Sequence, residues 1–107
     1  MLTDPPANPL GGKTLIVDAH NGDSYRRPSA ALLDAGEYDQ IFVRPGIYED
    51  KVFITGRPIH LLGAGRDEVQ IFFFFCCPLY LQQVSSGRIS GITFRYVGSH
   101  HHSAKNT

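Results

Sequence analysis

The chain has 107 residues, of which 42% are hydrophobic and 19% charged, and its 10 basic side chains balance its 10 acidic ones. This composition indicates one folded domain with a modest core and excludes a disordered chain. Because the formal net charge is zero, no overall field attracts nucleic acid or anionic lipid, so neither nucleic acid nor a membrane is expected as a partner. Weak repulsion between copies favours self-association instead.

The cellular compartment is inferred from the N-terminus and the two cysteines. The opening residues, MLTDPPANPLGGK, lack a basic region followed by an apolar stretch, so no secretory signal is expected. The longest apolar run, residues 69–77, contains Gln70 and stops at Pro78, and it is too short to cross a bilayer. Cys76 and Cys77 are neighbours, and a disulfide between them would be strained, so reduced thiols and a cytoplasmic location are favoured.

In chain order, residues 1–13 are rich in proline and glycine and are expected to form an extended arm, before a short strand at residues 14–18. A short helix is predicted near residues 29–35, with Ser29 as its N-cap and Gly36 at its end. Its buried face is expected to comprise Leu32, Leu33 and Ala35. Such a short helix is stable only if it packs against the rest of the domain.

After Gly36 the sequence predicts short strands that are rich in β-branched and aromatic residues and are separated by Gly, Pro, Asp or Ser. The expected strands are residues 41–44, 47–54, 59–62, 69–75, 79–84, 89 and 92–97. Residues 14–97 would thus form one mainly β domain, and the polar residues 98–107 a flexible tail.

The turns between these strands have the sequences of corners rather than of hairpins. They read RPG, GRP, GAGRD and VSSG, and no Asn-Gly or Asp-Gly pair separates two matched alternating runs. Strands joined by corners suit a backbone that winds into a solenoid, in which each turn buries its apolar face against the next. The alternative is an ordinary small β-sandwich or barrel with one helix.

The order of the motifs is distinctive. The short helix is followed by a strand, Pro-Gly-x-Tyr at residues 45–48, a charged segment at residues 49–51, an apolar strand, Pro58, and a strand that ends in Gly-x-Gly at residues 63–65. The later segment RISGITFRY, residues 88–96, places Ser-Gly between two strands. This order resembles the opening coils of right-handed parallel β-helix proteins of the pectin-lyase-like class. The resemblance implies a right-handed parallel β-helix of about three coils with the short helix as an N-terminal cap.

The corner residues have conformational reasons to be where they are. Pro45 fixes its φ and Gly46 permits a positive one, so together they make a sharp turn. Gly63 and Gly65 are expected where a side chain would collide with the backbone. Tyr48 is expected to lay its ring over the coil and to keep its hydroxyl in solvent.

The resemblance alone does not give a function. The pectin-lyase-like class includes pectin lyases, pectin methylesterases, polygalacturonases, carbohydrate-binding repeat modules and substrate-recognition parts of some ubiquitin-ligase subunits. Its enzymes carry their catalytic groups on central coils, beyond the opening ones, so the resemblance implies no catalytic residue in this chain. Three coils also leave one end of a solenoid open, which implies either a fragment of a longer protein or an oligomer that covers the open edge.

The run of phenylalanines at Phe72, Phe73, Phe74 and Phe75 allows two interpretations. Alternate side chains of a strand face opposite ways, so one set would fill the interior and the other would lie outside. Either both faces are buried in the core, or the outer set is an aromatic patch used for self-association or partner binding.

The residues that could carry chemistry are few. His100, His101 and His102 lie in the tail, where adjacent side chains do not easily converge on one ion, so no metal site is expected. His20 and His60 lack partners at zinc-ligand spacing, and His60 is expected to face outward from its strand. The carboxylate pairs Glu49–Asp50 and Asp67–Glu68 could serve acid–base chemistry on a sugar, but their basic neighbours favour solvated turns. No cofactor is expected.

Two functions remain open. The first is a non-catalytic module that binds a carbohydrate or a protein, or a self-associating scaffold. Its contact residues would be the exposed charged and aromatic side chains Arg44, Tyr48, Glu49, Arg95 and Tyr96. The second is the N-terminal fragment of a polysaccharide lyase, esterase or hydrolase.

Overall fold

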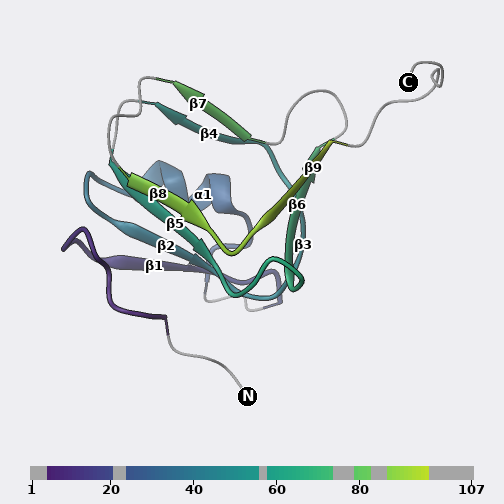
Figure 1. The fold of residues 1–107 in the computed structure, drawn as a ribbon, viewed down its shortest axis with the longest axis horizontal. Coiled ribbons are helices and arrows are strands. Elements are labelled where there is room, and N and C mark those ends of the chain that lie inside the picture. Colours follow the sequence, from purple (N-terminus) through teal and green to yellow (C-terminus); the bar gives the residue numbers. More distant parts are fainter. Residues whose placement is uncertain (1–4, 21–23, 56–57, 74–78, 83–86, 97–107) are drawn as a thin grey trace.

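The computed structural model describes residues 5–20, 24–55, 58–73, 79–82 and 87–96, and Figure 1 shows its ribbon. The elements are β1 (Thr14–Val17), α1 (Pro28–Asp34), β2 (Gln40–Val43), β3 (Gly46–Glu49), β4 (Val52–Thr55), β5 (Ile59–Gly63), β6 (Val69–Phe73), β7 (Leu79–Gln82), β8 (Gly87–Ser90) and β9 (Thr93–Tyr96). Within these residues, no helix is long and apolar enough to cross a membrane.

The strands form three parallel sheets. Sheet A has the order β1-β2-β5-β8, sheet B the order β3-β6-β9, and sheet C pairs β4 with β7. The described elements are strands apart from one short helix, so the fold is mainly β, as predicted. All of the strand pairings are parallel, so the described strands form no hairpin meander. From β2 onward the chain passes through sheets A, B and C in that order, repeats the order, and then enters A and B again. In Figure 1, sheet C lies at the top, sheet B at the right and sheet A at the lower left.

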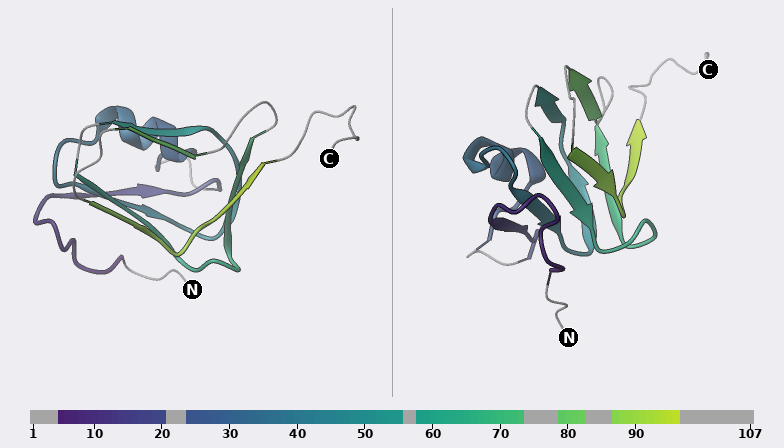
Figure 2. Two further views of the ribbon diagram at one scale, coloured as in Figure 1. Left: turned by 45° about the horizontal axis from the view of Figure 1, so that its top comes forward. Right: turned by 60° about the vertical axis from the view of Figure 1, so that its left-hand side comes forward.

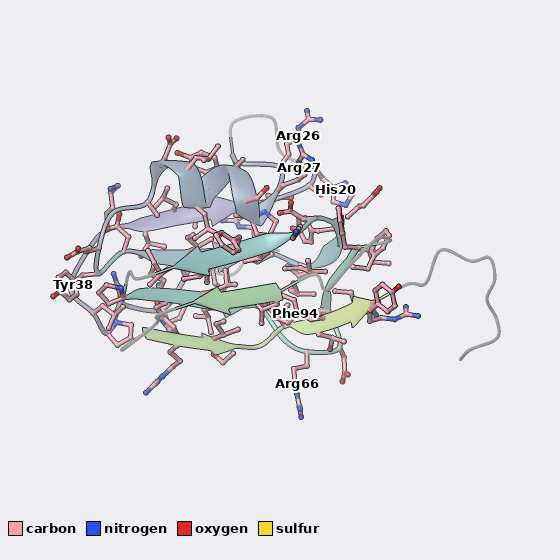
Figure 3. All side chains as sticks on the ribbon, turned by 90° about the horizontal axis from the view of Figure 1, so that it is seen from above. His20, Arg26, Arg27, Tyr38, Arg66 and Phe94 are labelled. Carbon is pink, nitrogen blue, oxygen red and sulfur yellow. The ribbon has the colours of Figure 1, made fainter. Side chains whose placement is uncertain are left out.

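The hydrophobic core is formed by inward-facing residues of all three sheets and of α1. These residues are aligned from strand to strand, because parallel strands in register stack like positions on top of one another. The aligned sets are Leu15, Ile41, Leu61 and Ile89 in sheet A, and Tyr48, Ile71 and Phe94 in sheet B, with Phe94 labelled in Figure 3. Each fully buried Ile or Leu side chain contributes about 1.5–3 kcal/mol to stability.

The single strand predicted for residues 47–54 is in fact two strands in two different sheets. The backbone turns at Asp50, between β3 and β4, although the Asp50 N–H still donates to Phe72 O across the sheet at 2.9 Å. Asp50 Oδ2 accepts a hydrogen bond from Ser29 N at 2.7 Å, and Asp50 Oδ1 accepts one from Lys51 N at 2.9 Å. The side chain of Asp50 therefore ties the corner to the start of α1, which the apolar pattern alone did not reveal.

The helix α1 packs against β1, β2 and β4, and two details differ from the prediction. Its N-cap is Arg27, without a side-chain capping bond, and Pro28 occupies the first turn, so Ser29 is not the N-cap. Pro28 suits this position because the first helical N–H groups have no partner within the helix. Leu33 is 86% exposed, because it lies about 200° around the helix from Ala31. The buried face is instead formed by Ala31, Leu32 and Ala35.

Residues 5–13 form no helix or strand, but they are bonded to the end of sheet A where β2 begins. Asn8 Nδ2 and Gly12 N donate to Tyr38 O at 2.7 and 2.9 Å, and Gln40 Nε2 donates to Pro6 O at 2.8 Å. Figure 2 shows this arm, coloured purple, along the outer side of sheet A. The arm thus covers part of a sheet face that would otherwise be open to solvent.

Some predictions lie outside the described residues. They concern Phe74, Phe75, Cys76, Cys77 and the tail at residues 98–107. The strand expected at residues 79–84 corresponds to β7, which is described from Leu79 to Gln82.

Candidate functional site

The outer face of sheet B brings together two of the sequence-predicted binding residues, Glu49 and Arg95. Outward-facing residues alternate with Tyr48 and Ile71, which are 2% and 0% exposed. We call this surface the sheet-B face; it consists of Ile47, Glu49, Gln70, Phe72, Thr93 and Arg95. Two cross-strand rows make it up, Ile47–Gln70–Thr93 and Glu49–Phe72–Arg95.

The charges of the sheet-B face lie at its two edges. Glu49 is on β3, Arg95 is on β9, both are exposed, and β6 runs between them. At the usual strand spacing the two positions are about 10 Å apart. Arg95 Nη1 donates to Gln70 Oε1 at 3.5 Å, so the guanidinium leans over β6. The face therefore has a negative edge, a positive edge and a neutral centre.

The face carries two large apolar side chains, one on its central strand β6 and one on the edge strand β3. Phe72 is half-buried between the two charged residues, and Ile47 on β3 is 67% exposed. Tyr96, which ends β9, is 59% exposed, but it alternates with Arg95 and is paired with Phe73, so it belongs to the opposite side of the sheet. Large apolar groups at such exposure, rimmed by polar residues, mark interaction surfaces more often than isolated surface side chains do.

Of the residues of this face, sequence reasoning singled out Glu49 and Arg95 for binding and Phe72 for self-association, but it missed Ile47, Gln70 and Thr93. The period-two alternation about Tyr48 would have placed Ile47 beside Glu49 on one face. Nothing in the sequence gives the register that aligns β3 with β6 and β9. Phe72 and Phe73 are both half-buried. Neither interpretation of the phenylalanine run holds in full, because these two side chains are neither completely buried in the core nor divided into a buried one and an exposed one.

Arg44 and Tyr48 do not join this surface, contrary to the expectation that both are exposed contact residues. Tyr48 is 2% exposed, and its hydroxyl donates to Arg44 O at 2.8 Å. Burial raises the pKa of Tyr48 above its ordinary value. Arg44 Nη1 lies 3.8 Å from Asp18 Oδ2, with only 15% of the Arg44 side chain exposed. These residues hold the corner between sheets A and B and serve the core.

The carboxylate pairs are not arranged for acid–base chemistry. Glu49 points outward from β3, whereas Asp50 is buried and bound to Ser29 N. Asp67 and Glu68 are exposed in the turn before β6, as predicted for a solvated turn. Within the described part of the chain, no three His, Cys, Asp or Glu side chains gather as potential metal ligands.

A second polar cluster lies on the outer face of sheet A, beneath the arm. Gln40 Nε2 donates to Pro6 O and, at 3.3 Å, to Thr14 Oγ1. The oxygen Gln40 Oε1 can only accept, so His60 Nδ1, at 2.6 Å, carries the proton of that hydrogen bond. His60 is 5% exposed, which corrects the prediction that it faces solvent. The physical reason is the cover that the arm provides.

The ionic state of this cluster follows from its burial. Burial, and then the positive charge of Arg88 on the neighbouring strand, lower the pKa of His60 below its ordinary value of 6.5. The other ring nitrogen, Nε2, is buried and has no hydrogen-bond partner among the described residues. A proton on Nε2 would thus bury an unpaired charge. His20, labelled in Figure 3, does not share this site; its backbone N–H donates to Asp18 Oδ1 at 2.9 Å.

We expect His60 to make stability depend on pH. Because the pKa of His60 is lowered by folding, the unfolded state binds more protons than the folded state below about pH 6.5, and stability falls as the pH decreases. His60→Gln should reduce the loss of unfolding free energy between about pH 7.5 and about pH 5.5, measured by urea denaturation. His20→Gln, which changes an exposed imidazole, is the matched control. Equal slopes for His60→Gln and the wild-type protein would contradict the assignment.

Asp39 fixes the end of the arm beside this cluster. Its carboxylate accepts hydrogen bonds from Lys13 N at 3.1 Å, from Lys13 Nζ at 2.8 Å and from Gly36 N at 2.8 Å. Burial raises the pKa of Asp39, but the bonds from Lys13 and Gly36 outweigh it, so the pKa lies below its ordinary value. Both oxygens of the carboxylate are thus used to anchor the arm.

Comparison of the chain with protein-family models, with curated proteins and with solved structures finds no match. A function is therefore assigned from the chemistry of the described side chains. The sheet-B face combines apolar side chains with opposite charges at its two edges, and it is the candidate site.

Proposed function

We propose that the chain folds as a right-handed parallel β-helix of about three coils and acts as a non-catalytic module that binds a protein partner. The proposed coils are β2-β3-β4, β5-β6-β7 and β8-β9, because each of them begins with a strand of sheet A and continues into sheet B. The right hand is supported by the strong preference of parallel crossover connections for that hand. The contacts of α1 with β1, β2 and β4 support its role as the N-terminal cap.

The single observation that carries the binding role is the composition of the sheet-B face. Phe72, half-buried on the central strand β6, lies between Glu49 and Arg95, and Ile47 on the edge strand β3 is 67% exposed. Protein interfaces combine an apolar centre with a polar rim in the same way.

A protein fits this face better than a glycan. Glycan binding would use an exposed aromatic ring. Of the two tyrosines expected as contact residues, Tyr48 is 2% exposed, and Tyr96, 59% exposed, alternates with Arg95 and so does not belong to the sheet-B face. Glycosidic cleavage commonly uses two carboxyl groups, whereas the sheet-B face contains one, Glu49. The residues of the sheet-B face therefore fit a non-catalytic protein-binding module better than a site that binds or cleaves a glycan.

Site-specific cross-linking tests this proposal. A photo-cross-linking amino acid at Ile47 should yield protein adducts in a cell extract, whereas the same amino acid at Leu33, 86% exposed on α1, should not. Adducts are expected to disappear in an Arg95→Glu background. Equal labelling from both positions would refute the proposal. So would retention by immobilised polygalacturonate that Ile47→Asp abolishes, because the face would then bind a glycan.

A further inference from the structure

We propose that the protein partner is a second copy of this chain, bound face to face through the sheet-B face about a two-fold axis. This inference rests on the proposed function and names its partner. The axis lies in the interface, parallel to the strands, and runs over β6. A two-fold contact uses the same patch on both copies, so the patch must be complementary to itself.

The charge order of the face meets this condition. In the row Glu49–Phe72–Arg95, the negative residue is on one edge strand, the positive residue is on the other, and Phe72 lies midway. Rotation by 180° about the axis reverses the row, so Glu49 of one copy faces Arg95 of the second copy, and Phe72 faces Phe72. The contact occurs twice by symmetry. A row with like charges at both edges would repel itself in the same arrangement.

The second row is also compatible with itself. The same rotation places Ile47 of one copy over Thr93 of the second copy and Gln70 over Gln70. The threonine methyl group can contact the isoleucine, and two facing amides can donate and accept hydrogen bonds reciprocally. Because the formal net charge of the chain is zero, two copies approach without overall repulsion.

The area of the sheet-B face indicates how tightly two copies would bind. Three strands of four residues cover about 14 Å by about 13 Å, roughly 200 Å² per copy, whereas stable complexes bury about 800 Å² per partner. The dimer is therefore weak, and we expect a dissociation constant above about 10 µM.

Sedimentation equilibrium from about 10 µM to about 1 mM, a range set by this weak affinity, tests the dimer through charge reversal. Glu49→Arg and Arg95→Glu each place like charges across both symmetric contacts, so each should weaken association about tenfold or more. The double variant Glu49→Arg/Arg95→Glu restores opposite charges and should return the dissociation constant to within about threefold of the wild-type value. Rescue by the double variant separates a specific contact from a general loss of folding.

Matched controls change the net charge elsewhere. Glu37→Arg and Arg26→Glu alter exposed residues away from sheet B by the same charge steps, and both should leave the dissociation constant unchanged. Failure of the double variant to restore dimerisation, or growth beyond two copies, would overturn the inference. Growth would point instead to pairing at β7, β8 and β9, each of which has a strand neighbour on one side only among the described residues.

The two proposals fail in different ways. A cross-link from position 47 to a different protein, together with a monomeric wild-type chain at about 1 mM, would overturn the dimer and keep the protein-binding role. A cross-linked species of twice the chain mass, lost in Arg95→Glu and restored in the double variant, would support both. An absence of any adduct from position 47 with a monomeric chain would reject both.

Discussion

Gly63→Ala is expected to destabilise the fold by about 2–4 kcal/mol, because the added methyl group meets backbone that cannot move aside. A Cβ at Gly63 would lie 2.2 Å from Gly91 O and 2.4 Å from Ile92 Cγ1. Gly63 ends β5, and Gly91 forms the corner between β8 and β9, so two successive passages of the chain touch here without side chains. Gly91 also has a φ of 72°, which disfavours any side chain at that position.

The measurement is the unfolding free energy from urea denaturation, and the chain supplies a close control. Gly65→Ala adds the same methyl group two residues later, where the nearest atoms are Glu68 Cγ and Cδ at 3.9 Å. Its effect should stay within about 0.5 kcal/mol. If both variants lower the unfolding free energy by the same amount, then the close approach of β5 to the β8–β9 corner does not explain the glycine at position 63.

This pair of glycines also shows what the sequence can and cannot predict. Both Gly63 and Gly65 were expected at positions where a side chain would collide, and the collision exists only at Gly63. The difference arises from Gly91, which reaches position 63 through strand pairing across the sheet. A local motif identifies a corner, but it does not identify what packs against that corner.

The strand pattern was largely predictable from the sequence, whereas burial on the outer faces was not. Short β-branched runs and Gly/Pro corners located the strands, because those residues favour extended backbone and sharp turns locally. His60 was expected in solvent and is buried, because Pro6 and its neighbours cover sheet A. Tyr48 was expected to reach solvent and instead donates to Arg44 O. Both differences depend on contacts between segments that are distant in sequence.

The candidate site was predictable as single residues and not as a surface. Glu49 and Arg95 were identified because they are charged residues in exposed strand positions. Their place in one row depends on the registers of β3 with β6 and of β6 with β9. A shift of one residue in either register would move one of them to the opposite face. The inferred two-fold symmetry could therefore be recognised only once both registers were known.

Asp50→Ala is expected to cost about 1.5–3 kcal/mol in unfolding free energy, because it removes a charged acceptor from a buried site. Asp50 is 5% exposed, and its carboxylate binds Ser29 N at 2.7 Å at the start of α1. The negative charge of this carboxylate is also stabilised by the positive end of the helix dipole. Asp50→Asn keeps an acceptor oxygen and loses the charge, so its cost should be smaller.

Glu49→Ala is the matched control for this prediction, because it changes the neighbouring carboxylate, which is exposed on the sheet-B face. Its effect on unfolding should stay within about 0.5 kcal/mol, while it should weaken the proposed dimer. Asp50→Ala should do the reverse, since β3 remains bonded to β6 through the backbone, including Asp50 N to Phe72 O. Of these two adjacent acidic residues, Asp50 would then stabilise the fold and Glu49 would stabilise the proposed dimer. Equal costs of unfolding for both would show that the corner at Asp50 is not fixed by its bond to α1.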